Sequence, residues 1–382
     1  MDLFYWQLVY FLVKNRYRII KLSNAPHEIW LESFEHKGAP LIRLVRYDID
    51  WSSWLQRDLE YTRQIAEQLQ KRHLRRSLPI LNIYISAYPP VDDWEWIVNE
   101  PTEHSSLHTI LVHSANRMQA LQDISQIIHV SVSLPAIEHD MDPQFAIQSI
   151  QRHVFRLEKE RQEKEKRLME HGQPRIVYAL IAIQVLMFLF LEWKGGSTNS
   201  AVLIQYGAKF NPLIQSGEWW RLITPVFLHI GFLHLLMNTM ALYYLGIVVE
   251  RLYGSWRFLF IYLLAGFFGT VGSFLFTSSI SAGASGAIFG LFGALLYFGT
   301  VYRHLFFQTM GTNIIGLIVL NLGLGLLIPG IDNAGHIGGL IGGFLAANIV
   351  HLPLHRSWSK QLLSFLVTLS LLSFSLYMGF KG

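Results

Sequence analysis

The sequence predicts a polytopic α-helical membrane protein with a soluble α+β domain at its N-terminal end. Of its 382 residues, 51% are hydrophobic and only 15% are charged, and its mean hydropathy is +0.30, which is too apolar for a soluble protein of this length. The composition changes abruptly near Pro174. After that point, apolar stretches of about 20 residues, the length that crosses a bilayer, follow one another.

Seven of these stretches are expected to span the membrane. They are Ile176 to Trp193, Ile223 to Glu250, Phe258 to Phe276, Ala284 to Tyr302, Gly311 to Ile328, Gly335 to His351, and Leu362 to Met378. The fourth to sixth are rich in Gly and Ala, which allows helix backbones to approach closely. We therefore expect these three helices at the centre of the bundle.

The distribution of Lys and Arg predicts the orientation. The basic segment from Arg161 to Arg175 precedes the first span, and positive charge is retained on the cytoplasmic side. The loops after the second, fourth and sixth spans also carry Arg or Lys, whereas Lys194, Lys209 and Arg221 in the first loop are exceptions. We expect a multi-pass protein of a bacterial cell membrane, with its N-terminus on the cytoplasmic side. We expect no signal peptide.

The first 140 residues are expected to form the α+β domain, followed by a charged helical linker over residues 141–175. The predicted elements are a helix Leu3 to Lys14, strands Tyr17 to Leu22, Glu28 to Phe34 and Leu41 to Tyr47, a helix Ser52 to Arg76, and a strand Ile80 to Tyr88. This order loosely resembles the core of restriction-endonuclease-like domains. The strands lack an acidic and lysine nuclease motif, so we expect neither nuclease activity nor a nucleic-acid partner.

An oxygen- and nitrogen-rich cluster in this domain is a weak candidate for a divalent cation site. It contains Asp92, Asp93, Glu95, Glu103, His104, His108 and His113, of which Asp92, Asp93, His104 and His108 are the strongest candidates. Solvated loop residues are the alternative, because the spacing enforces no coordination geometry. We expect no metal and no cofactor, and leave open a cytoplasmic partner or ligand of this domain. The chain has no cysteine, so covalent catalysis must use another nucleophile.

Ser285 is the leading candidate nucleophile. It stands between Gly283 and Gly286 at the start of the fourth span, where small neighbours admit a substrate backbone and the first peptide N–H groups of a helix are free to donate. This arrangement suits acyl transfer. The alternative interpretation is a Gly and Ser face for helix packing.

His336 is the second candidate, at the start of the sixth span. A histidine within hydrocarbon is costly and marks function by default, although a structural hydrogen bond is the alternative. Gly339 and Gly343, one helical turn apart, would let this helix press against a neighbour and bring His336 to Ser285.

His229, His234 and Asn238 form the third group, near the start of the second span. His234 and Asn238 share a helix face and could donate to an oxyanion or tie helices together. The second, fourth and sixth spans run in the same direction and carry these polar residues in their first turns. All three sites should therefore lie at a similar depth, in the outer half of the bilayer.

These motifs, together with Trp220-Arg221 in the first loop, resemble the signature of the rhomboid family of intramembrane serine proteases. The resemblance covers residues 176–351 and implies a six-helix core, to which residues 352–382 add a seventh transmembrane helix. It implies that Ser285 is the nucleophile, His336 the general base, and His234, Asn238 and the Ser285 N–H the oxyanion donors. It also implies that Trp220 and Arg221 shape the first loop, and that transmembrane substrates enter laterally from lipid.

The sequence departs from the family at Phe289, where many members have a tyrosine packed on the catalytic histidine. We expect activity to be preserved, because ring packing is the expected role of this position. A non-catalytic rhomboid-like protein that binds membrane clients is the alternative function, but it would have lost the serine or histidine. A transporter would carry charged residues within its spans or an internal repeat, neither of which is evident.

Overall fold

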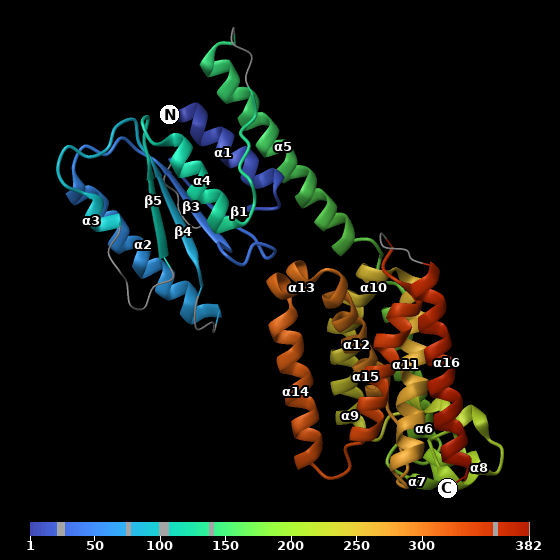
Figure 1. Ribbon diagram of the computed structural model, residues 1–382. Coiled ribbons are helices and arrows are strands. Elements are labelled where there is room, and N and C mark those ends of the chain that lie inside the picture. Colours follow the sequence, from blue (N-terminus) through green and yellow to red (C-terminus); the bar gives the residue numbers. More distant parts are fainter. Residues whose placement is uncertain (21–26, 74–77, 99–106, 137–140, 354–357, 382) are drawn as a thin grey trace. The chain divides into compact units, whose positions relative to one another are not determined.

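The computed structural model describes residues 1–20, 27–73, 78–98, 107–136, 141–353 and 358–381. They divide into two compact units, Met1–Glu163 and Lys164–Gly382, each considered by itself below (Figure 1). The division falls inside the charged helix that the sequence predicts as a linker.

The N-terminal unit confirms the predicted α+β class. Its elements are α1 (Asp2–Lys14), β1 (Arg18–Ile20), β2 (Glu28–Glu32), β3 (Leu41–Arg46), α2 (Ser52–His73), β4 (Ile80–Ile85), α3 (Glu95–Val98), β5 (Leu107–Val112), α4 (Arg117–Ile128) and α5 (Pro143–Met169). The sequence predictions omitted α3, β5 and α4. Strand β5 is only partly buried and carries His108 and Thr109, so its apolar pattern is weak.

The five strands form one mixed sheet in the order β1-β2-β3-β4-β5, antiparallel as far as β3 and parallel from β3 to β5. Residues of α1, α4 and α5 pack on one face, and residues of α2 and α3 pack on the other (Figure 1). Because β3 and β4 are covered on both faces, nearly all their side chains are buried, as is usual for parallel strands.

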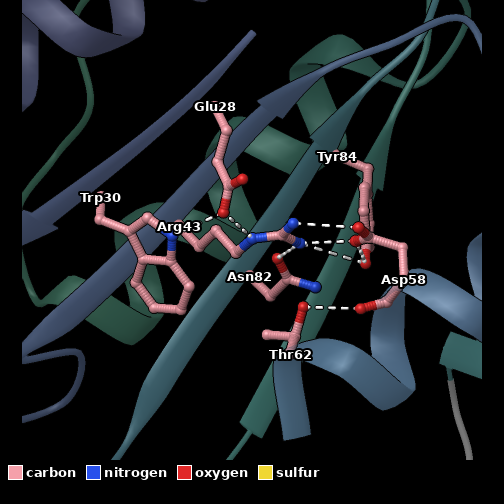
Figure 2. A network of polar contacts seen from close by, with 7 residues as sticks. All are labelled: Glu28, Trp30, Arg43, Asp58, Thr62, Asn82 and Tyr84. Carbon is pink, nitrogen blue, oxygen red and sulfur yellow. Dashed lines mark hydrogen bonds and ion pairs between the residues drawn. The ribbon is translucent and has the colours of Figure 1, made fainter. Parts of the chain in front are cut away.

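A buried charge network ties the face of the sheet to α2 (Figure 2). The Arg43 side chain is only 2% exposed, and its Nε donates to Oε1 of Glu28 at 2.7 Å. Its Nη1 donates to Oδ2 of Asp58 at 2.6 Å and to Oδ1 of Asn82 at 3.2 Å, and Tyr84 Oη also donates to Asp58. A buried guanidinium is stable only with such partners, so this network joins β2, β3, β4 and α2.

The described residues of the second unit form helices joined by loops. It contains α6 (Ile176–Trp193), α7 (Ser200–Gln205), α8 (Asn211–Gln215), the 3₁₀ turns η1 (Trp219–Leu222) and η2 (Thr224–Phe227), α9 (Phe232–Ala241), the π-helical turn η3 (Leu242–Gly246), α10 (Ile247–Tyr253), α11 (Ser255–Phe276), α12 (Ser285–Val301), α13 (Arg303–Thr309), α14 (Gly311–Leu327), α15 (Asn333–Val350) and α16 (Trp358–Lys381). Each of the seven predicted spans overlaps a helix or a continuous helical stretch of this unit.

Four described helices are long and apolar enough to cross a membrane by themselves: α6, the continuous stretch Phe232–Tyr253, α11 and α16. The pair α13 and α14, bent by 72°, makes a fifth if the two form one span. Helix α12 is apolar but has only 17 residues, and α15 is rich in glycine. These two helices pack against α11 at the centre, where a helix contacts other helices more than lipid (Figure 1).

The predicted start of the second span at Ile223 is wrong. Residues up to Ile230 form two 3₁₀ turns and a connecting segment, and the helix begins only at Phe232, after Gly231. Pro225 lacks an N–H and Gly231 has a positive φ of 77°, so neither continues a helix. His229 therefore precedes the span instead of lying within it.

A buried carboxylate holds the first span to the end of the second. Glu250 is fully buried and accepts hydrogen bonds at 2.9 Å from the N–H groups of Arg175, Ile176 and Val177, which begin α6. Ser255 Oγ donates to the same carboxylate at 2.5 Å. These peptide N–H groups have no acceptor within their own helix, and an acidic group is favoured at a helix N-terminus.

We predict that Arg43→Met destabilises the N-terminal unit by about 3 kcal/mol or more, because the Glu28 and Asp58 carboxylates would lose their cation. The measurement is amide hydrogen exchange of β3 and β4 in the full-length protein, followed by mass spectrometry. Arg16→Met is the matched control, since its ion pair with Glu35 is exposed and contributes less than about 1 kcal/mol. Equal exchange protection in both variants would contradict a stabilising role for the network.

Candidate active site

The backbones of α12 and α15 are in contact through glycines. A Cβ added at Gly339 would lie 1.9 Å from the carbonyl oxygen of Gly286, and one added at Gly343 would lie 1.9 Å from that of Gly290. No other residue type fits at either position without displacing a helix. These contacts set the distance between the first turns of the two helices, which carry Ser285 and His336.

Ser285 and His336 are joined by a hydrogen bond. Nε2 of His336 lies 3.0 Å from Oγ of Ser285. The histidine is buried and the serine is half-buried. The ring of Phe289 stacks on the imidazole with a centroid distance of 4.2 Å and an angle of 11° between the planes. This stacking fixes the plane of the imidazole without requiring a hydroxyl from Phe289.

No carboxylate completes a triad among the described residues. Asp332 caps α15, as expected, because its Oδ1 accepts a hydrogen bond from the N–H of Gly335 at 2.9 Å. Within the described part of the chain, Nδ1 of His336 has no hydrogen-bond partner. Stacking and helix packing therefore orient the imidazole, and the polar constellation is a pair.

His234 borders the same site from α9. The N–H of Ile230 donates to its Nδ1 at 3.3 Å, so the neutral ring carries its proton on Nε2. A Cβ added at Gly283 would lie 2.9 Å from that Nε2, and Gly283 has a positive φ of 148°. The segment just before Ser285 thus lies directly against the N–H group of His234.

Asn238 and His229 both contact His234. The buried Asn238 side chain donates to the carbonyl oxygen of His234, in its own helix, at 2.9 Å. The described contacts of Asn238 do not include Ser285. His229 is fully buried, and its ring lies edge-on to that of His234 with centroids 5.4 Å apart. The three polar residues therefore form one cluster. Within this cluster, His234 is the residue that contacts the segment just before Ser285.

The comparisons with known proteins show the family to which the chain belongs. Residues 216–353 match the Rhomboid domain family. The chain is 43% identical over 380 residues to Rhomboid protease GluP of Bacillus subtilis, an alignment that covers 98% of this chain and 74% of GluP. The chain belongs to the rhomboid family. This relationship confirms the predicted enzyme class, a serine endopeptidase of the rhomboid type.

The plant relatives cover less of this rhomboid protein. RHOMBOID-like protein 4 of Arabidopsis thaliana is 39% identical over 169 residues, which is 44% of this chain and 43% of the relative. RHOMBOID-like protein 1 of the same plant is 41% identical over 153 residues, or 38% of this chain and 39% of the relative. The alignment with GluP, in contrast, is long enough to include the N-terminal unit.

The first loop of the rhomboid domain is built around Arg221. Its guanidinium is buried, donates to the carbonyl oxygens of Ile204 and Ala208 at 2.5 and 3.1 Å, and pairs with Glu218 at 2.7 Å. The half-exposed ring of Trp220 lies against the guanidinium, 4.4 Å from its carbon to the ring centroid. Both residues therefore hold the loop together.

The sequence indicates only a charge in the first loop at Lys209 and does not reveal its role. The side chain is fully buried next to the segment that leads to Ser285. Burial lowers the pKa of Lys209 to about 8, an effect that Asp332 partly opposes. As an ammonium group, Lys209 has three N–H donors.

The candidate cation cluster of the N-terminal unit does not assemble among the described residues, which contain no group of three or more acidic or histidine side chains suited to a metal. Asp92 instead accepts hydrogen bonds from the N–H and Oγ of Ser52, both at 2.7 Å, at the start of α2. These bonds lower the pKa of Asp92. His108 is exposed on β5 and Asp93 is exposed in its loop. Glu103 and His104 lie outside the described residues.

We predict that Gly339→Ala abolishes activity and lowers the thermal stability of the rhomboid domain. The added methyl group would push α15 away from α12, and such overpacking costs about 1–3 kcal/mol. Labelling of Ser285 by a fluorophosphonate probe and thermal unfolding in detergent measure the two effects. Gly316→Ala in α14 is the control, because a Cβ there meets nothing within 4 Å. Wild-type labelling of Gly339→Ala would mean that the helices can separate without breaking the Ser285–His336 contact.

Proposed function

We propose that this rhomboid protease cleaves transmembrane segments of other membrane proteins with Ser285 as nucleophile and His336 as general base. The distance of 3.0 Å between Oγ of Ser285 and Nε2 of His336, across two helices, carries this proposal. A nucleophile and a base within hydrogen-bond reach are the requirement for covalent acyl transfer.

In the first step, Ser285 Oγ attacks the carbonyl carbon of the scissile bond while its proton passes to His336 Nε2. The imidazolium then returns this proton to the leaving amine as the carbon–nitrogen bond breaks, which leaves an ester on Ser285. A water molecule, deprotonated by His336, attacks the ester and releases the new carboxyl end and the serine. Atoms and protons balance without a cofactor.

The oxyanion of both tetrahedral intermediates needs hydrogen-bond donors. The Ser285 N–H opens α12 and has no intrahelical acceptor, and His234 carries its ring proton on Nε2, against the segment of Gly283. Asn238 is proposed as a third donor, through the second N–H of the amide whose first N–H donates to the carbonyl of His234. The three donors come from α9 and α12.

The proposed orientation has a cytoplasmic N-terminus and an active site that opens to the outer side of a bacterial cell membrane. The basic residues that precede α6 support it. The N-terminal unit would then be on the cytoplasmic side, available to a cytoplasmic partner or ligand. Substrates would enter laterally from lipid, since the segments to be cut are themselves within the bilayer.

We predict that Ser285→Ala and His336→Ala each abolish cleavage of a single-span substrate while leaving expression and membrane insertion intact. The two residues act as one unit, so the double variant should be scarcely less active than either single variant. The measurement is the rate of product formation in proteoliposomes, with fluorophosphonate labelling as the independent assay of Ser285.

Asp332→Asn is the control for this series. An asparagine keeps an oxygen that can cap α15, so most activity should be retained. A loss as large as that of His336→Ala would mean that Asp332 is a third catalytic residue. Residual cleavage by purified Ser285→Ala would rule out the proposed nucleophile.

Substrate preference should follow helix stability. A peptide carbonyl within a transmembrane helix is engaged in the helix, and it becomes accessible to Ser285 only after local unwinding. We predict that cleavage occurs near the outer end of the substrate helix, beside a small residue, and that a Gly or Pro a few residues further into the membrane increases its rate. A run of leucines at the same place should suppress cleavage.

Mass spectrometry of the products from such a substrate series tests both the predicted position of cleavage and the requirement for local unwinding of the substrate helix. The matched pair differs only in the Gly or Leu residues of the unwinding region. Cuts near the cytoplasmic end would contradict the proposed orientation, and equal rates for the pair would contradict the requirement for unwinding.

A further inference from the structure

Lys209 is a buried cation in the first loop, and each of its donors meets an oxygen. Its side chain is 0% exposed. Nζ donates to the carbonyl oxygen of Thr277 at 2.5 Å, to that of Ser279 at 3.0 Å, and to Oγ1 of Thr277 at 3.2 Å. All three acceptors belong to the connection between α11 and α12. A lysine is rarely buried unless its charge is compensated in this way.

The segment that Lys209 holds leads directly to Ser285. The backbone of Lys209 pairs with that of Ser281 in both directions, with N···O distances of 2.9 and 3.2 Å. Two residues further on, the N–H of Gly283 donates to the carbonyl oxygen of Pro225 at 2.9 Å. The connection therefore lies against the first loop along most of its length, and Ser285 begins the next helix.

The first loop is in turn fixed by Arg221. The carbonyl oxygen that Arg221 binds at 3.1 Å belongs to Ala208, the residue immediately before Lys209. Thr224 Oγ1 donates to the carbonyl oxygen of Gly207 at 2.7 Å. A series of hydrogen bonds thus links Arg221 to residues 207–209, and links these residues to the connection that leads to Ser285.

We propose that Lys209 is a positioning residue for the serine nucleophile, through which the first loop sets the place of Ser285 and of the neighbouring oxyanion donors. This inference rests on the proposed function of Ser285 and His336. Lys209 touches neither the nucleophile nor the base and acts by holding residues 277–281. Its ammonium suits this task better than an apolar side chain, which would remove the donor to the carbonyl of Ser279 and one donor to the carbonyl of Thr277, which also accepts from Asn211 Nδ2 at 3.2 Å.

The experiment compares Lys209→Met, which keeps the length of the side chain but has no donors, with Lys209→Gln, which keeps an amide donor. For each full-length variant in detergent, the fluorophosphonate labelling rate per folded molecule, kcat and KM for a single-span substrate, and the unfolding temperature are measured. Lys209→Met should label and turn over about 10-fold or more slowly, because small displacements of a nucleophile are costly. Its KM should change by less than about twofold, since a positioning defect acts on the chemical step. Lys209→Gln should recover part of the loss.

Two controls separate positioning from general stability. Tyr262→Phe removes the buried hydrogen bond from Gln184 Nε2 to Tyr262 Oη, which joins α6 and α11 at a distance of 2.7 Å and has no partner in the first loop. It should lower the unfolding temperature but leave the labelling rate unchanged. Lys194→Met alters an exposed lysine of the same loop that lies over the rings of Trp193 and Phe190, and it should change neither quantity.

The outcomes are distinct. Labelling of Lys209→Met at the wild-type rate, or an equal loss of labelling in Tyr262→Phe, would overturn the positioning role. A KM that rises while kcat stays constant would also overturn it, because Lys209 would then act on substrate binding. Labelling or cleavage by Ser285→Ala would instead refute the proposed function, whatever the result at Lys209.

Discussion

The direct contact of backbone on backbone between α12 and α15 is the constraint on which the rest of the rhomboid domain depends. Gly286 and Gly290 on one helix meet Gly339 and Gly343 on the other at distances that exclude any side chain. No hydrophobic effect drives helices together in lipid, so packing of small residues is the main source of such close association. It also brings a serine and a histidine that are 51 residues apart within hydrogen-bond reach.

The hydrogen bonds around this contact satisfy polar groups that the membrane cannot. Glu250 accepts from three peptide N–H groups that begin α6, and Asp332 does the same for one N–H group of α15. Arg221 and Lys209 bind carbonyl oxygens of loops that have left their helices. In each case, a charged side chain is the partner of backbone groups that lie at a helix end or in a loop, where the regular hydrogen bonds of a helix are missing.

A feature could be predicted from the sequence where its residues differ in polarity from the residues around them. The helix from Ile176 to Trp193 could be predicted with its bounds, since the apolar run and the helix coincide. Ser285 and His336 could be singled out because polar residues are conspicuous in apolar, glycine-rich segments. The start of the second span could not, since Pro225 and Gly231 lie in a largely apolar stretch that continues directly into the helix. The burial of Lys209 leaves no sequence pattern, because it depends on acceptors almost 70 residues away.

The order of these helices along the chain has a consequence for biogenesis. A ribosome delivers the N-terminal unit first, and then α12 with its serine well before α15 with its histidine. Until α15 arrives, Ser285 lacks its hydrogen bond to His336, and the glycine face of α12 lacks the backbone that covers it. The pair of serine and histidine can therefore form only after the sixth predicted span has been made and has docked against α12. Under the proposed mechanism, a newly made molecule becomes active at that point and not earlier in its own insertion.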